Sequence, residues 1–485
     1  MAPAGTTESP LRVAIVGSGP AGFYTAEHLL RQEDVAIEVD MFDRLPTPFG
    51  LVRAGVAPDH PKIKSVIRVY EKTAAREGFR FFGNVEVRPS PSGGRPDTGS
   101  RKPNQLTFDD LREHYHAVIC AYGSATDRSL GIDGEDLPGS HAATEFVAWY
   151  NAHPDFADRE FDLATPRVVV IGNGNVAADV ARMLALTRSE LEETDTADHA
   201  IDALAESGVE EIVVLGRRGP AQAAFTNPEV RELGEMVDAD IVIDQAEVEL
   251  DDLSREFVDS GDAGPTNTRN VEIFAGFAER EPEGKRRRIV LRFLASPVEI
   301  RGAGKVESIV IGRNELQRDE IGAVRAVDTG DREEIETGLV LRSIGYKGEG
   351  IEGLPFDERA GVIPNERGRV TDPDTGEQML GAYAVGWIKR GPSGVIGTNK
   401  KDALETVSAL LEDVAEGRVF EPRGDATADA AEKMVAEKAP DAVTFKGWQA
   451  IDEAEVGRGE PLGRPRVKFS KVEEMLEAAK AGAKT

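Results

Sequence analysis

The chain has a single cysteine, Cys120, in 485 residues. One thiol cannot form an internal disulfide, a Cys-x-x-Cys pair or the ligand set of an iron–sulfur cluster. This excludes the redox-active disulfide on which many flavoproteins with two nucleotide sites depend. It also favours a reducing compartment, so we expect a cytoplasmic protein. The seven histidines show no zinc-type spacing, and we expect no metal site.

Positive charge is also scarce. The 58 Lys and Arg residues face 87 Asp and Glu residues, which gives a formal net charge of −29. Nucleic acid and anionic membranes are therefore poor partners. Long apolar runs are missing as well, because no segment approaches the roughly 18 consecutive apolar residues of a membrane-spanning helix. Residues 1–10 lack the basic and apolar regions of a signal peptide, and we expect no membrane insertion.

The sequence does contain the same pattern twice. Residues 11–22 (LRVAIVGSGPAG) and residues 166–177 (PRVVVIGNGNVA) each place a short apolar run directly before a glycine-rich turn. Each pattern predicts a buried parallel strand, a turn and a helix. Two later apolar runs, within residues 117–124 and 338–345, both end in glycine. Together they predict an α/β protein with two dinucleotide-binding, Rossmann-like domains.

The first glycine-rich turn predicts a site for FAD. The pyrophosphate of a dinucleotide must approach backbone N–H groups at a helix N-terminus, and Gly17 and Gly19 leave room for it. Gly22 lets the helix pack tightly on the strand. The next apolar strand, residues 36–42, ends at Asp43, whose carboxylate could accept hydrogen bonds from ribose hydroxyls.

The second glycine-rich turn predicts a site for NADP(H) rather than NAD(H). Gly172 and Gly174 repeat the fingerprint, and an alanine takes the place of the third glycine. The strand that follows ends in Arg217 and Arg218, where an NAD site would carry an acid. Guanidinium groups bind a 2′-phosphate through charge-assisted hydrogen bonds. An acidic helical insertion over residues 189–206 would explain why the arginines lie unusually far from the glycines.

The order of these segments predicts that one domain interrupts the other. We expect residues 1–122 to begin the FAD-binding domain and residues 123–344 to form the inserted NADP-binding domain. Residues 345–485 would complete the FAD-binding domain and add a C-terminal extension. Gly123 and Gly345 would be the hinges at which the chain crosses between the domains.

Other segments bear on the flavin and on the surface. Residues 386–399 lead into an amphipathic helix whose polar, positive start would face the flavin ring. Trp387 could pack on this ring, and a place in the protein core is an equally common alternative for a tryptophan. Residues 46–61 are too rich in Pro and Gly for a regular element and predict a shaped wall. Residues 89–103 predict a loop, and the acidic residues 244–264 predict edge structure around the second domain.

These segments resemble those of the adrenodoxin reductase type of ferredoxin–NADP(+) reductase, essentially from Leu11 to Lys468. The motifs that carry the resemblance are VGSGPAG (16–22), PFGLVR (48–53), GVAPDHP (55–61), FGNVEV (82–87), VAWYN (147–151), GNGNV (172–176), GRRGP (216–220) and WIKRGPSGVIGT (387–398). The resemblance implies an NADP-dependent flavin oxidoreductase. Such an enzyme transfers hydride between NADPH and FAD, and single electrons to or from a ferredoxin-type iron–sulfur protein.

The resemblance also implies which residues would form the two sites. FAD would contact Ala21, Asp43, Leu51, Val87, Trp387, Gly394, Val395 and Ile396. NADP would contact Asn173, Gly174, Asn175, Val176, Arg217, Arg218, Glu229 and Gly394. His60 and Glu232 match polar residues that the family places near the nicotinamide, where they would orient the ring or tune hydride transfer. A role as simple wall residues is the alternative.

The place where a ferredoxin would dock stays open. Vertebrate members of the family carry a basic segment after the second nucleotide site that binds an acidic ferredoxin, whereas residues 244–252 are strongly acidic here. Residues 285–288 (KRRR) are the best remaining basic cluster, and a charged hairpin turn explains them equally well.

Other functions are compatible with two nucleotide sites. A subunit that feeds electrons to a partner enzyme, as the small subunits of glutamate synthase do, usually carries cysteine-rich cluster sites, which Cys120 alone cannot supply. A flavoprotein monooxygenase would use NADPH with oxygen and a small substrate, and a reductase could serve an acceptor other than ferredoxin. A non-enzymatic nucleotide sensor would bind cofactor without turnover, and two complete fingerprints with the Trp387 segment argue against it.

Overall fold

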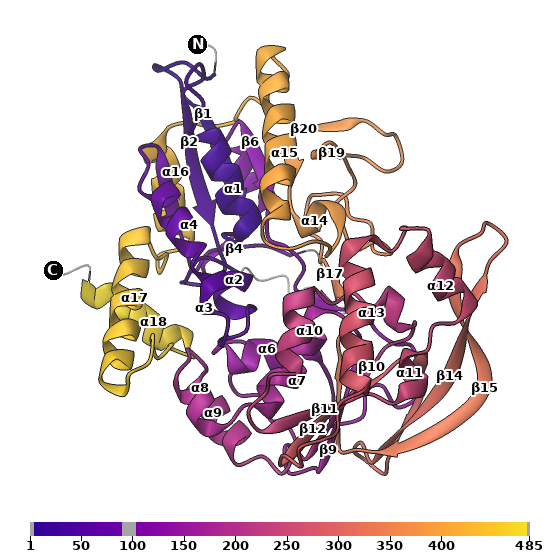
Figure 1. Ribbon diagram of the computed structural model, residues 1–485. Helices are drawn as coiled ribbons and strands as arrows, with labels where there is room; N and C mark the ends of the chain where they lie inside the picture. Colours follow the sequence, from indigo (N-terminus) through magenta and orange to yellow (C-terminus); the bar gives the residue numbers. More distant parts are fainter. Residues whose placement is uncertain (1–3, 90–102, 483–485) are drawn as a thin grey trace.

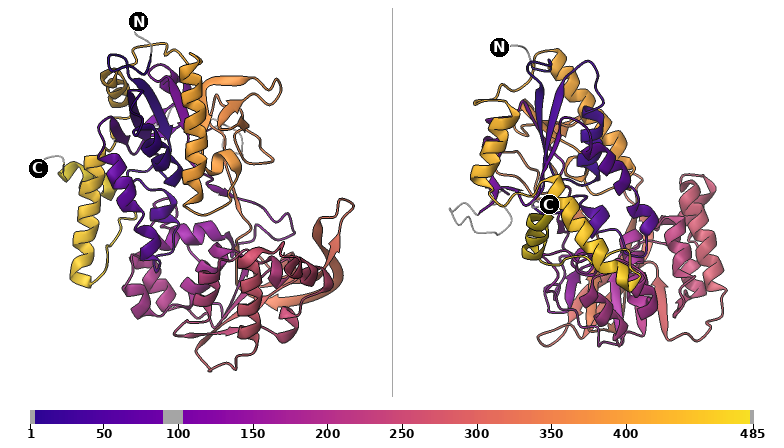
Figure 2. Two further views of the ribbon diagram at one scale, coloured as in Figure 1. Left: turned by 45° about the horizontal axis from the view of Figure 1, so that its top comes forward. Right: turned by 90° about the vertical axis from the view of Figure 1, so that its left-hand side faces the viewer.

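The computed structural model describes residues 4–89 and 103–482. It contains two larger sheets, which lie in the upper and lower halves of Figure 1 and remain separate layers in both views of Figure 2. The strands of one sheet lie between positions 140 and 342, and those of the other come from both sides of this stretch. The predicted α/β class with one dinucleotide-binding fold inserted in another is therefore confirmed. Residues 90–102 of the loop predicted at 89–103 lie outside the described residues.

The first sheet combines the two ends of the chain. Its order is β18-β19-β20-β6-β1-β2-β3, parallel from β20 to β3 and antiparallel at the β18–β19 edge. β1 is buried along its whole length because β2 and β6 flank it and helices cover both faces. The strands are β1 (Leu11–Val16), β2 (Ile37–Phe42), β3 (Phe79–Phe82), β6 (Ala117–Cys120), β18 (Asn365–Glu366), β19 (Arg369–Thr371) and β20 (Gln378–Ala384). A small separate pair is formed by β4 (Glu86–Val87) and β5 (Gln105–Leu106).

Apolar helix faces cover both sides of this sheet. On one side lie α1 (Pro20–Leu29), α4 (Ile67–Ala74), α15 (Thr398–Ala415), α17 (Phe445–Gly459) and α18 (Val472–Gly482). On the other side lie α5 (Phe108–Arg112) and α16 (Ala428–Lys438). α15, the helix expected after the Trp387 segment, buries Ala403, Val407 and Leu410 against α1.

The second sheet is entirely parallel, in the order β11-β12-β10-β9-β16-β8. Its strands are β8 (Ser140–Ala142), β9 (Arg167–Ile171), β10 (Glu211–Leu215), β11 (Ala239–Val242), β12 (Arg287–Arg292) and β16 (Leu339–Arg342). One face packs on α6 (Ala143–Tyr150), α7 (Asn175–Ala185), α9 (Asp198–Ala205), α10 (Asn227–Leu233) and α13 (Gly264–Ala278). The other face packs on an antiparallel sheet of β13 (Ala295–Arg301), β14 (Ser308–Arg318) and β15 (Val324–Glu336).

The acidic stretches that were expected to be insertion and edge structure form short helices. Residues 189–206 belong largely to α8 (Arg188–Glu192) and α9, as the insertion predicted. Residues 244–264 contain α11 (Gln245–Val248) and α12 (Asp252–Asp259), which follow β11, the edge strand of the second sheet. Two of their acids cap these helices, because the carboxylates of Asp244 and Asp251 accept hydrogen bonds from the N–H groups of Ala246 and Ser254.

Two expectations are wrong. Residues 46–61 contain a helical turn, α2 (Leu51–Ala54), and α3 (Pro61–Lys64) begins at their end. Residues 285–288 are no hairpin, because β12 begins at Arg287 and runs parallel to β10 and β11. The Arg287 side chain is buried, pairs with Asp238 and donates to the carbonyl of Val209. The basic cluster is therefore committed to internal contacts.

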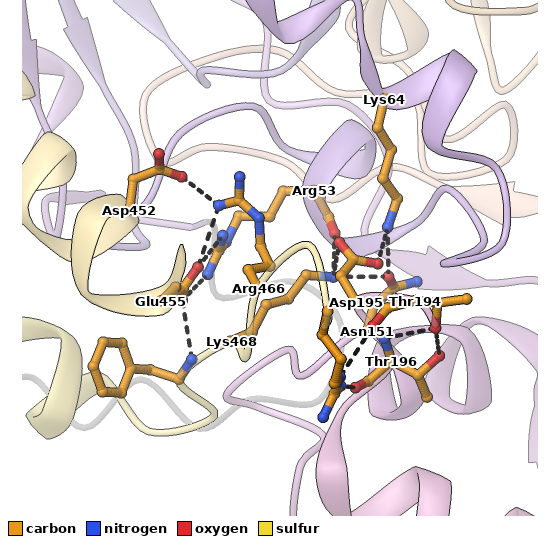
Figure 3. A network of polar contacts seen from close by, with 12 residues as sticks. Arg53, Lys64, Asn151, Thr194, Asp195, Thr196, Asp452, Glu455, Arg466 and Lys468 are labelled. Atoms are coloured by element: carbon orange, nitrogen blue, oxygen red, sulfur yellow. Dashed lines mark hydrogen bonds and ion pairs between the residues drawn. The ribbon is translucent and has the colours of Figure 1, made fainter. Parts of the chain in front are cut away.

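The two sheets are joined by more than the chain crossings. The crossings pair with each other as a short antiparallel ribbon, β7 (Thr126–Asp127) with β17 (Tyr346–Lys347). In addition, residues 464–469 run from the C-terminal helices onto the second sheet's domain (Figure 3). Arg464 donates to the carbonyls of Thr194 and Thr196, and the ammonium of Lys468 lies 3.0 Å from Asp195.

Asp195 is the centre of this C-terminal contact. Lys64, from α3, approaches the same carboxylate at 2.6 Å, and all three side chains are almost completely buried. Burial alone would raise the pKa of Asp195, but the two ammonium groups outweigh it and hold the pKa far below its ordinary value. The carboxylate is therefore ionised and joins segments from both halves of the molecule.

We expect Asp195→Asn to lower the free energy of unfolding by about 3–5 kcal/mol, because it leaves the buried ammonium of Lys468 without its carboxylate. Asp198→Asn is the matched control, since Asp198 pairs with Arg464 but its side chain is 60% exposed. It should cost less than about 1 kcal/mol. Urea unfolding of the two variants measures the difference, and equal losses would contradict the assignment.

Candidate functional site

The turn after β1 has the geometry that a bound pyrophosphate needs. Gly17 has a φ of +108°, and a Cβ there would lie 2.5 Å from Cα of Tyr122. A Cβ on Gly22 would lie 2.2 Å from the carbonyl oxygen of Gly17, so only glycine lets α1 come this close. α1 starts at Gly19 without a side-chain cap, which leaves its first N–H groups available to an anion.

Asp43, at the end of β2, is tied to this turn. Its carboxylate accepts hydrogen bonds from the N–H of Ser18 at 2.9 Å and from the hydroxyl of Ser18 at 2.5 Å. It also accepts the N–H of Leu45 at 3.0 Å. The main-chain carbonyl of Asp43 accepts the N–H of Val85, two residues before Val87, at 2.8 Å. The segment that leads to Val87 therefore lies next to Asp43, beside the glycine turn.

Segments from far along the chain close around the same turn. Phe49, at a φ of +84°, donates its N–H to the carbonyl of Ser18 at 3.0 Å. The segment containing Trp387 reaches the turn too, because a Cβ on Gly386 would lie 2.6 Å from Cβ of Ala21. Trp387 itself is half-buried, with its ring 5.1 Å from that of Tyr346.

Apolar side chains at the border of this region are exposed. Leu51, in α2, is 38% exposed, and Val395 is 61% exposed in the loop before α15. Gly394 has a φ of +82° and Ile396 is half-buried in the same loop. The structure thus brings the glycine turn, α2 and the Trp387 segment together, and leaves apolar surface beside them that a large planar ring would cover.

The turn after β9 repeats the first one. Gly172 has a φ of +138°, and a Cβ there would lie 2.2 Å from the carbonyl oxygen of Ser343. α7 starts at Gly174, again without a side-chain cap. The carbonyl of Asn173 and the side chain of Asn175 accept hydrogen bonds from the N–H groups of Ala224 and Thr226, both at 2.8 Å. Val176, the second residue of α7, is half-buried beside them.

Arg217 and Arg218 follow the end of β10 and are both exposed. Their backbone is fixed, since the carbonyl of Arg217 accepts the amide of Asn314 at 2.9 Å. Burial and the neighbouring Arg217 lower the pKa of Arg218. Within residues 4–89 and 103–482, neither guanidinium has an ion pair or a side-chain hydrogen bond. Two adjacent cations without a carboxylate partner are suited to an anion such as a phosphate.

His60 and Glu232 meet between the two halves of the molecule. His60 is the residue before α3, Glu232 lies on α10, and Nε2 of the imidazole is 2.8 Å from the carboxylate. Glu229, one turn earlier on α10, lies 3.9 Å from Nδ1. Segments from the two sheets are therefore in direct contact at two residues for which the family resemblance predicts a place near the nicotinamide.

Arg182, on α7, fixes this contact from behind. The guanidinium is 3% exposed and lies 2.5 Å from Asp59, 2.8 Å from Asp179 and 3.2 Å from Glu229. Burial alone would lower the pKa of Arg182, but these carboxylates outweigh it and raise it. Since Asp59 directly precedes His60, the ion pair holds the His60 segment onto the second domain.

More carboxyl groups surround Arg182 than its single positive charge can neutralise. Burial raises the pKa of Asp179 to about 7, although Arg182 opposes the rise. Ligand atoms of His60, Glu229 and Glu232 lie within 4.8 Å of one another, a spacing that a metal ion could use. The guanidinium of Arg182 already pairs with both glutamates, so it serves as their counter-ion.

Sequence reasoning missed Asp59, Asp179 and Arg182. Asp59 lies in the GVAPDHP motif (55–61), but nothing in this motif indicates a partner for its carboxylate. Asp179 and Arg182 lie three residues apart in an otherwise apolar helix, on the same side of it. An ionic pair within a buried helix is a signal that could have drawn attention to them.

Comparisons with known proteins agree with this arrangement. Residues 11–213 match a family model described as pyridine nucleotide-disulphide oxidoreductase. The chain is 49% identical over 474 residues to the NADPH-ferredoxin reductase FprA of Mycobacterium tuberculosis, covering 96% of this chain and 98% of that protein. It is 39% identical to the mitochondrial NADPH:adrenodoxin oxidoreductase of Salvelinus fontinalis, covering 98% and 92%. A solved structure of M. tuberculosis FprA in complex with NADPH superposes with a TM-score of 0.87 at 48% identity, covering 97% of this chain and 100% of that one.

We expect Gly22→Ala to weaken flavin binding by about tenfold or more, because its Cβ would contact the carbonyl of Gly17 at 2.2 Å and force the turn apart. The measurement is the flavin absorbance per mole of purified protein. Gly276→Ala is the matched control, since it also lies within a helix but has no atom within 4 Å of the added Cβ. Full flavin content in Gly22→Ala would refute the close-packing role.

Proposed function

Because the chain belongs to the family of NADPH–ferredoxin reductases that includes adrenodoxin oxidoreductase, we propose that it passes electrons from NADPH through FAD to a ferredoxin-type iron–sulfur protein. The resemblance drawn from the motifs is thus confirmed over nearly the full chain. The one observation that carries the proposal is the contact of His60 with Glu232, which joins the two halves of the molecule that each carry one glycine turn.

The residues present fit FAD at the first turn. Gly17 and Gly22 leave the space that a Cβ would fill, and α1 offers uncapped N–H groups. We assign Gly17, Gly19, Ala21, Gly22, Asp43, Leu51, Val87, Trp387, Gly394, Val395 and Ile396 to this site. FAD bound there supplies the chemistry of accepting a hydride and releasing electrons one at a time. The protein positions the ring and sets its surroundings.

We assign the second turn to NADP(H). Asn173, Gly174, Asn175 and Val176 form the helix start that would receive the pyrophosphate, and Arg217 and Arg218 would bind the 2′-phosphate. Glu229, His60 and Glu232 would border the nicotinamide. A hydride that leaves NADPH leaves positive charge on this ring, and the carboxylates around Arg182 favour that charge.

The strand memberships support the domain division at 122/123 and 344/345. β6 ends at Cys120 and the second sheet begins with β8 at Ser140, while β16 ends at Arg342 and β17 begins at Tyr346. We propose these domain boundaries. We also propose a cytoplasmic location, because the single, buried Cys120 forms no disulfide and therefore needs no oxidising compartment.

The function is tested by rapid mixing of the purified holoprotein with NADPH or NADH, followed by a [2Fe–2S] ferredoxin and cytochrome c. We expect bleaching of the flavin that prefers NADPH, and then cytochrome reduction that depends on ferredoxin. A flavin that bleaches without passing electrons to ferredoxin would contradict the proposal. Oxygen uptake coupled to hydroxylation of a small substrate would instead favour a monooxygenase.

Replacing both Arg217 and Arg218 by alanine should lower kcat/KM for NADPH by about a hundredfold or more, because two charge-assisted hydrogen bonds are lost and each is worth roughly 1.5–3 kcal/mol. The value for NADH, which lacks the 2′-phosphate, should stay within about twofold and serves as the internal control. Steady-state kinetics with both coenzymes measures the ratio. Equal losses for the two coenzymes would place the 2′-phosphate elsewhere.

Flavin reduction by NADPH should become faster as the pH rises through about 7. Asp179 has a pKa of about 7, and its ionisation adds negative charge beside a nicotinamide that becomes positive. The titratable groups that interact with Asp179 are Arg182, Glu229 and His60, together with the buried phenols of Tyr150 and Tyr346. Asp179→Asn should remove this step, which we expect to be roughly threefold to tenfold.

Stopped-flow traces across pH 5–9, roughly the range in which such groups titrate, measure the step. Asp202→Asn is the control, because Asp202 is an exposed helical aspartate paired with Arg188. The same pH step in Asp179→Asn and in the unmodified protein would assign the titration to another group.

A further inference from the structure

The segment that follows His60 is positively charged, although the whole protein is strongly negative. Residues 61–76 contain five basic residues and one acidic residue, a net charge of +4 in a chain whose net charge is −29. They form α3 and α4, which continue from one to the other through a turn at residues 65–66. In Figure 1 these helices descend from the side of the first sheet to the boundary between the two sheets.

The inner face of these helices packs on the first sheet. Tyr70 and Thr73 are buried, and the Tyr70 ring stacks on Phe23 at 4.9 Å. The outer face repeats at helical spacing and is exposed. It presents Lys62, Ser65, Arg68, Val69, Lys72 and Arg76.

Of the cations on this outer face, Arg76 donates to the carbonyl of Leu30, and three others have no partner within the described protein. Among the described residues, Lys62, Arg68 and Lys72 have neither an ion pair nor a side-chain hydrogen bond. Lys64, which points the other way, is by contrast paired with Asp195. Apolar side chains lie among the cations, because Ile63 is 41% exposed and Val69 is 39% exposed.

We propose that the outer face of α3 and α4 is where the acidic iron–sulfur carrier docks; this inference rests on the proposed function. The partner is recognised by its charge, since carboxylates would pair with Lys62, Arg68 and Lys72 while Ile63 and Val69 exclude water between them. Residues 285–288 are not the docking site, because each of their side chains already has a hydrogen-bond or ion-pair partner within the protein.

The position of the face suits electron transfer. His60, at the start of α3, lies in the contact with Glu232, and α2 with the exposed Leu51 packs beside α3. From His60 to Lys72 a helix rises about 18 Å, which one small globular partner with a radius of gyration of about 13 Å would cover. A carrier bound along the cations would therefore rest next to the flavin site.

The overall acidity does not prevent this docking. At physiological ionic strength, charges farther apart than about 8 Å are largely screened. An acidic partner therefore responds to the cations that it touches more than to the distant acids of the chain. Glu71 is the one acid within residues 61–76.

The test uses the flavin-loaded full chain carrying Arg68→Glu together with Lys72→Glu. These positions lie outside the nucleotide sites, and glutamate is as good a helix former as the residues it replaces. With an acidic [2Fe–2S] ferredoxin and cytochrome c, we expect KM for ferredoxin to rise about tenfold at low ionic strength, and its dependence on salt to become weaker. Reduction of a neutral quinone such as menadione by NADPH should stay unchanged.

The matched control carries Arg423→Glu together with Lys433→Glu, which changes the net charge equally. Both residues are exposed, and Lys433 lies on α16, on the opposite face of the first sheet from α4. An unchanged KM in the α4 variant, or an equal rise in the control, would overturn this docking face while leaving the proposed function intact. Failure of the unmodified protein to reduce any acidic ferredoxin would overturn both.

Discussion

The structure depends on one buried arginine at the junction of its two halves. Arg182 reaches from α7 to Asp59 in the segment before α3 and to Glu229 on α10. The guanidinium group has five donors in a rigid fork, so it fixes the directions of its partners as well as their distances. The contact of His60 with Glu232 follows from this arrangement, because each residue lies within three positions of one of these anchored carboxylates.

A second set of buried charges holds the halves together at another edge. Asp195 pairs with Lys64 and Lys468, and Arg464 donates to carbonyls of the same segment. Buried ion pairs add little net stability, but separating one member costs about 3–5 kcal/mol. A different orientation of the two domains would separate Asp195 and Arg182 from their partners. Charge therefore sets the geometry between the nucleotide sites, whereas apolar packing sets the geometry within each sheet.

The distribution of charge matters more than its total. The chain is strongly acidic, yet unpaired cations lie next to one another at Arg217 and Arg218 and close together along α3 and α4. Acids gather instead around Arg182, where a nicotinamide would become positive. Because water and salt screen distant charges, each group of cations can act on its own ligand. Arg217 and Arg218 would act on a phosphate, and the cations along α3 and α4 would act on an acidic protein.

The sequence by itself determined the features whose physical cause is local. The clash that excludes a side chain at Gly22 comes from Gly17, five residues away, and Arg217 follows its strand directly. Apolar runs predicted the strands β1 and β9, and the repeated fingerprint predicted two nucleotide folds, because strand, turn and helix are consecutive in each.

Only the tertiary structure decided the contacts between distant segments. Asp59 and Arg182 are far apart in the chain and meet because two sheets are packed together. Residues 285–288 look like a surface cluster, but Arg287 is buried, since its partners Asp238 and the carbonyl of Val209 come from other elements. A sequence records which side chains carry charge, whereas their partners are set by the long-range packing that brings unrelated segments within hydrogen-bond distance.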